Sequence, residues 1–154
     1  MIIARRELSR VRMCMALLML LPGLSSGHSP HHVITDVAAT ASDDGTDGDI
    51  YIVVTDQLFR SSDGGAVWKN LISGLTNRFS LTSVVLSPGY AADSTAFVAS
   101  EGDGIFVSQN RGDSWETLNA GLDQLDIGVL SISPDFVADG RLLAASTSGG
   151  VWRR

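Results

Sequence analysis

The sequence predicts an all-β protein built from repeated units of four short antiparallel strands. Two segments, 61–68 and 108–115, share the pattern Ser-x-Asp/Asn-x-Gly-x-x-Trp, and their first residues lie 47 positions apart. Strand-length apolar segments bounded by turn residues continue across 33–154, and no run there has helical spacing. A pattern that recurs every 20–50 residues or so indicates stacked supersecondary units. We therefore expect one repeat architecture over residues 33–154.

The repeat extends well beyond this shared pattern. Residues 84–93 align with 130–139, which lie 46 positions further on, and 96–100 align with 142–146. The segments 104–106 and 150–152 match in the same way. Three units result, and their approximate bounds are 33–80, 81–126 and 127–154. In the third unit Arg154 stands where the shared pattern would begin again, so this unit is expected to be truncated and to lack its last strand.

The middle unit shows the predicted strands most clearly. The second strand of each unit is almost continuously apolar, as expected when both faces of a sheet pack against neighbours. The shared pattern forms the turn between the third and fourth strands. The four strands are expected at about 82–87, 95–100, 104–108 and 114–118.

Eight residues of the shared pattern are interpreted as structural. The glycines can adopt positive φ at no steric cost, and the Asp or Asn side chain can accept hydrogen bonds from turn N–H groups. The serine hydroxyl adds a bond across the turn. Each tryptophan is expected to bury apolar surface between sheets, which contributes about 2–4 kcal/mol. The eight residues are Ser61, Asp63, Gly65, Trp68, Ser108, Asn110, Gly112 and Trp115.

This pattern resembles the Asp-box of the BNR repeat, which occurs in sialidases, sortilin-like receptors and photosystem assembly factors. The resemblance implies β-propeller blades, each a four-stranded antiparallel sheet. Closed propellers have about four to eight blades. This chain has two complete units and a truncated third, which predicts an incomplete propeller. In these families the box lies at the blade periphery, away from the active centre. The resemblance therefore implies a structural role for the box.

The first 27 residues have the layout of a secretory signal peptide. Four arginines precede the apolar run 13–21, and small residues follow it. The run is shorter than the roughly 20 residues that span a bilayer, although an uncleaved signal anchor remains the alternative. We expect cleavage after Gly27, a flexible tail over 28–32, and a secreted or periplasmic protein with no membrane contact after cleavage.

The predicted mature chain is acidic and contains no cysteine. Loss of residues 1–27 removes Cys14 and leaves seven Lys and Arg against 16 Asp and Glu, a net charge of −9. No disulfide is then available. The scattered basic residues argue against nucleic acid or an anionic membrane as partner.

Two groups of residues are weak candidates for a metal site. His28, His31 and His32 could bind Cu²⁺ or Zn²⁺ near a new N-terminus, but a polar tail is the simpler interpretation. The acidic run that includes Asp43, Asp47 and Asp49 offers oxygen ligands that suit Ca²⁺. It aligns with a loop of the next unit, so a solvated hairpin turn is favoured. We predict no metal and no cofactor.

No catalytic motif is present in the sequence. Tyr51 and Tyr90 stand inside repeat patterns, and no pair of carboxylates stands out as a glycosidase pair. We therefore predict an exported, non-catalytic scaffold that binds protein or glycan. A homo-oligomer that completes a propeller is a further expectation. The alternative is a fragment of a BNR-type, sialidase-like glycoside hydrolase whose catalytic blades are absent.

Overall fold

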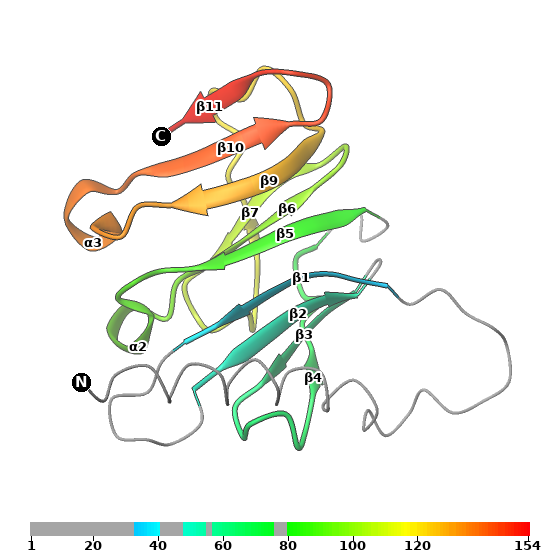
Figure 1. Ribbon diagram of the computed structural model, residues 1–154, viewed down its shortest axis with the longest axis vertical. Coiled ribbons are helices and arrows are strands. Elements are labelled where there is room, and N and C mark those ends of the chain that lie inside the picture. Colours follow the sequence, from blue (N-terminus) through cyan, green and yellow to red (C-terminus); the bar gives the residue numbers. More distant parts are fainter. Residues whose placement is uncertain (1–32, 41–47, 55–56, 76–79) are drawn as a thin grey trace, which may run out of the picture. The chain divides into compact units, whose positions relative to one another are not determined.

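The computed structural model describes residues 33–40, 48–54, 57–75 and 80–154, which all belong to one compact unit, His31–Arg154. These residues form three antiparallel sheets, one from each predicted repeat (Figure 1). Within these described residues, helix is confined to two single turns. The predicted all-β class is confirmed.

Each sheet is built in chain order. The first contains β1 (Ile34–Ala39), β2 (Ile50–Val54), β3 (Gln57–Ser61) and β4 (Lys69–Asn70). The second contains β5 (Leu81–Leu86), β6 (Ala96–Ser100), β7 (Gly104–Ser108) and β8 (Glu116–Thr117). The third contains β9 (Ile127–Ile132), β10 (Leu142–Ser146) and β11 (Val151–Arg153). The strands of the second sheet match the expected ranges to within two residues.

In the second and third repeats the connection between the first and second strand was expected to be a loop, and it contains a helical turn instead. These turns are α2 (Tyr90–Asp93) and α3 (Phe136–Asp139). In α2 the Ser87 hydroxyl donates to the Asp93 carboxylate at 2.6 Å and accepts the Gly89 N–H at 3.0 Å. Ser133 makes the equivalent bonds around α3. Four residues are too few for helical periodicity to appear in a sequence.

The sheets pack side by side through their first strands. Strand β5 lies next to both β1 and β9 (Figure 1). Buried side chains form one apolar cluster that includes residues of the first and second sheets, and another that includes residues of the second and third. All five residues of β6 are buried, which agrees with its continuously apolar sequence. The second sheet is therefore covered on both faces.

The third sheet differs from the others at its outer edge. Strands β3 and β7 each pair with a two-residue fourth strand, whereas β11 pairs only with β10 among the described residues. In the same part of the chain no helix is long and apolar enough to span a membrane.

Candidate functional site

The two segments that share the Ser-x-Asp/Asn-x-Gly-x-x-Trp pattern, 61–68 and 108–115, form turns with the same hydrogen bonds. They are called the first and second box. In the first, the Ser61 hydroxyl donates to Asp63 Oδ1 at 2.7 Å and accepts the Gly65 N–H at 2.8 Å. Asp63 Oδ1 also accepts the Val67 N–H at 2.9 Å. These bonds, first that from Val67 and then that from Ser61, hold the pKa of the Asp63 carboxyl below its ordinary value.

The second box repeats this arrangement with a neutral amide. The Ser108 hydroxyl donates to Asn110 Oδ1 at 2.8 Å and accepts the Gly112 N–H at 2.8 Å. Asn110 Oδ1 accepts the Ser114 N–H at 3.0 Å. Gly65 and Gly112 have φ of 94° and 80°, the positive values that the turn requires. The acceptor geometry is therefore what the turn needs, and the negative charge is dispensable.

The two box tryptophans occupy different environments. Trp115 is 3% exposed and packs with Leu71 and Leu75, which follow the last strand of the first sheet. The backbone N–H of Trp115 donates to the Ser73 carbonyl at 2.9 Å. Trp68 is only half-buried, so the expectation that each tryptophan is buried between sheets is wrong for Trp68. Among the described residues no segment equivalent to 71–75 precedes the first sheet, so Trp68 has no such surface to cover it.

A buried polar network joins the first and second sheets. The hydroxyls of Tyr51 and Tyr90 are 2.6 Å apart, and the Tyr90 hydroxyl donates to Asp49 Oδ2 at 2.7 Å. Burial raises the pKa of both tyrosines, so both hydroxyls stay protonated near neutral pH. The Arg111 guanidinium lies 5.9 Å from the Tyr90 ring centroid, and Arg60 donates to the Arg111 carbonyl.

This network corrects the expectation for Asp49. A solvated hairpin turn was favoured and a calcium site was the alternative, but the Asp49 residue is 6% exposed and bonds to Tyr90. The counterparts of Tyr51 and Tyr90 at the next interface, 46 residues on, are Phe97 and Phe136. Both pairs are edge-to-face, with centroids 6.0 Å and 5.4 Å apart. The network therefore occupies a structural position of the repeat.

The other metal candidates lie outside the described residues. They are His28, His31, His32, Asp43 and Asp47. Among the residues that the structure does describe, no group of three His, Cys, Asp or Glu side chains could hold a metal ion.

Polar side chains on the inner strands connect neighbouring sheets, a feature that the sequence reasoning missed. Asp36 Oδ2 on β1 accepts the Ser83 hydroxyl at 2.9 Å and the Val84 N–H at 2.8 Å. Ser83 Oγ on β5 accepts the Leu130 N–H of β9 at 3.3 Å. Val84 and Leu130 are 46 residues apart, so each contact serves the same position of the following repeat. The signal available in the sequence was a polar residue, Asp36 and then Ser83, within the first strand of two successive repeats.

An open groove of about 590 Å³ runs along these three inner strands. Asp36 and Ser83 are engaged between the strands, as is Thr82, whose hydroxyl donates to the Ile127 carbonyl at 2.7 Å. The exposed lining is divided about equally between polar and apolar surface, and aliphatic side chains make up its apolar part. Val37 on β1 is 45% exposed and Val129 on β9 is 58% exposed.

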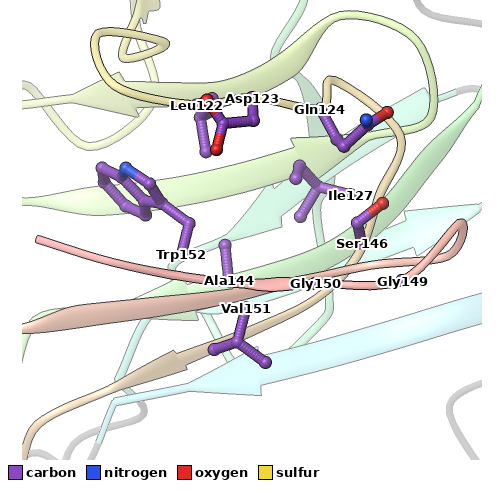
Figure 2. A pocket seen from close by; sticks show the side chains of 10 residues that line it. All are labelled: Leu122, Asp123, Gln124, Ile127, Ala144, Ser146, Gly149, Gly150, Val151 and Trp152. Carbon is purple, nitrogen blue, oxygen red and sulfur yellow. The ribbon is translucent and has the colours of Figure 1, made fainter.

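A smaller hollow of about 300 Å³ lies on the third sheet, where Leu122, Ile127 and Trp152 border the same space (Figure 2). Asp123 and Gln124 are at its rim. This hollow is near β11, at the edge that has no fourth strand among the described residues.

Comparison with solved structures supports a β-propeller-like fold. The chain superposes on an ancestral GH74 enzyme with a TM-score of 0.52 and 18% sequence identity. The match covers 79% of this chain, and the chain spans about a fifth (20%) of the length of that enzyme. No protein-family model matches the sequence, and no curated protein matches it. At this identity the likeness concerns the fold alone.

Proposed function

We propose that this chain is a non-catalytic scaffold of BNR/Asp-box blades that binds a ligand along its inner strands. The observation that carries the proposal is the groove over β1, β5 and β9. Aliphatic side chains make up the apolar half of its exposed surface, and three of its polar side chains, Asp36, Thr82 and Ser83, are engaged between the sheets. A surface of this kind suits recognition by apolar contact. It offers no free pair of groups for acid–base chemistry.

The lack of an aromatic side chain in the groove favours a polypeptide ligand over a sugar. Val37 and Val129 can bury side chains of an extended segment, whereas the groove contains no aromatic side chain on which a sugar ring could stack. Both ligand classes can be tested with the same protein, by selection from a displayed peptide library and by a glycan array.

The decisive variant is Val129→Arg, which places a charge in the groove. Binding of any selected ligand should weaken at least about tenfold, because a buried charge opposes apolar contact. Val67→Arg is the matched control, since Val67 is 67% exposed and lies on the first box, outside the groove. If Val129→Arg binds as the wild type does, the groove is not the binding surface.

A piece of a glycoside hydrolase is the second candidate function. The likeness to an ancestral GH74 enzyme, of which this chain spans about a fifth (20%), favours it. Hydrolysis requires two carboxyl groups facing each other across a bond at a defined separation. We place those groups outside the described residues under this alternative. Release of reducing ends from polysaccharides by the chain alone would contradict a non-catalytic role.

Export and self-association complete the proposal. Export rests on residues 1–27, and N-terminal sequencing of material outside the cytoplasm should find His28 first.

Self-association rests on the edge of the third sheet, where Val151 is 76% exposed. Light scattering coupled to size exclusion should show an oligomer, and a compact monomer would contradict it.

A further inference from the structure

The hollow beside Trp152 has a filled counterpart one repeat earlier. There, the second box sits on the segment that leaves the first sheet. The backbone N–H of Trp115 donates to the Ser73 carbonyl, and a Cβ at Gly74 would overlap the Trp115 backbone. The Trp115 side chain belongs to the same buried cluster as Leu75 and Phe106. One box therefore fills one interface between consecutive blades.

The segment that leaves the second sheet has the same backbone conformation. Gly121, which lies 47 residues after Gly74, has φ of 84°, compared with 89° for Gly74. The Leu122 N–H donates to the carbonyl three residues earlier, as the Leu75 N–H does. The surface on which a box rests is thus formed a second time.

The side chains around the hollow also repeat those around Trp115. Leu122 corresponds to Leu75, and Trp152 corresponds to Phe106. The main difference is exposure. Leu75 and Phe106 are buried, whereas Leu122 and Trp152 are only half-buried. The hollow of about 300 Å³ lies where the repeat would place a box tryptophan.

We propose that this hollow is a receptor for a polypeptide segment of the sequence Ser-x-Asp/Asn-x-Gly-x-x-Trp followed by a short strand. The tryptophan side chain would enter between Leu122 and Trp152. The backbone N–H of this tryptophan would donate to the Ala120 carbonyl, which corresponds to that of Ser73. The following strand would pair with the edge of β11 that has no partner among the described residues, as β8 pairs with β7.

A second folded copy of this chain cannot insert one of its own boxes into the receptor, whatever other contacts it makes with the third sheet. Its Trp115 is buried in its own core, and its first box is attached to β3 and β4. Docking that box here would bring a whole sheet onto the position that β9–β11 already occupy. The occupant is therefore a box segment without three strands of its own.

A synthetic peptide of residues 108–118 contains one box and its strand, and it tests the proposal. The peptide is labelled with fluorescein, and its fluorescence anisotropy should rise when the purified chain is added. Replacing the residue of the peptide that corresponds to Trp115 by alanine should weaken binding at least about tenfold, because the indole is the buried anchor.

Two glycine variants of the chain provide a matched pair. Gly121→Ala should weaken peptide binding at least about tenfold, because its Cβ would meet the peptide backbone as a Cβ at Gly74 would meet that of Trp115. Gly140→Ala also places a side chain at positive φ, has open space around it, and should bind normally. Val129→Arg should also bind normally, which separates this receptor from the groove.

Three results would overturn the proposal. The first is no binding at about 1 mM peptide by a chain that is shown to be folded. The second is equal binding of the alanine peptide. The third is an equal loss of binding for Gly121→Ala and Gly140→Ala.

Discussion

The Asp36 carboxylate accepts a hydrogen bond of 2.9 Å from the Ser83 hydroxyl, which links the inner strands of the first and second sheets. Ser83 in turn accepts the N–H of Leu130 on the third sheet. The corresponding position of β9 is Val129, which is apolar and exposed. Side chains rather than a continuous backbone ladder therefore connect consecutive sheets along the groove.

Replacing Asp36 with alanine should lower the free energy of unfolding by about 1.5–3 kcal/mol, the usual contribution of hydrogen bonds to a charged group. The change leaves the Ser83 hydroxyl and the Val84 N–H without their acceptor. Urea unfolding measures the effect. Asp123→Ala is the control, because Asp123 is exposed, and an equal loss in both variants would contradict the assigned contact.

Trp115→Ala should destabilise the chain by about 3–5 kcal/mol, because it leaves a cavity between the first two sheets. Trp68→Ala should cost clearly less, since Trp68 is half-buried. The two variants remove the same side chain from the same position of the box. Equal midpoints of denaturation would show that the difference in packing is not real.

The tyrosine network should behave as a unit. Tyr90→Phe alone leaves the buried Asp49 carboxylate without its donor and should cost about 1–3 kcal/mol. The triple variant Asp49→Thr, Tyr51→Phe and Tyr90→Phe reproduces the residues of the next interface, Thr95, Phe97 and Phe136. We expect it to be more stable than Tyr90→Phe in urea unfolding, because no charge is then left unpaired. Additive losses would contradict a coupled network.

Acid sensitivity should differ between the two boxes. The pKa of Asp63 is lowered in the folded state, so its contribution to stability is present above the unfolded pKa of about 3.9. That contribution is lost as the pH falls through the lower folded value. Asp63→Asn keeps the acceptor, as Asn110 does in the second box, and removes the titration.

Urea unfolding between about pH 5 and pH 2 should therefore show a shallower loss of stability for Asp63→Asn than for the wild type. Asn110→Asp is the converse variant and should steepen the loss. Parallel pH profiles for all three proteins would rule out the hydrogen bonds assigned to Asp63.

The sequence predicted the features that repeat locally. The strands of the second sheet and the positive φ of Gly65 and Gly112 follow from apolar runs and turn chemistry within a few residues. The short helices were missed because the Ser87–Asp93 bond stabilises a single turn, which has no periodicity to detect.

Contacts between repeats were harder to predict. The environment of Trp68 depends on whether another segment covers it, and its own sequence, which matches that of Trp115, does not contain this information. Asp49 was assigned to a solvated turn because the acidic run aligns with a loop of the next unit, yet Asp49 is buried against Tyr90, 41 residues away. Asp36 drew no notice because its partners, Ser83 and Val84, lie on another sheet.

The inner groove should bind a ligand without altering it chemically, and a single titration can show this. The tightest ligand selected from the peptide library or the glycan array is titrated calorimetrically into the wild type, Val129→Arg and Val67→Arg, and is then recovered for mass spectrometry. We predict binding by the wild type and Val67→Arg, at least about tenfold weaker binding by Val129→Arg, and a ligand recovered intact. Equal binding by all three proteins, or a cleaved ligand, would contradict the account.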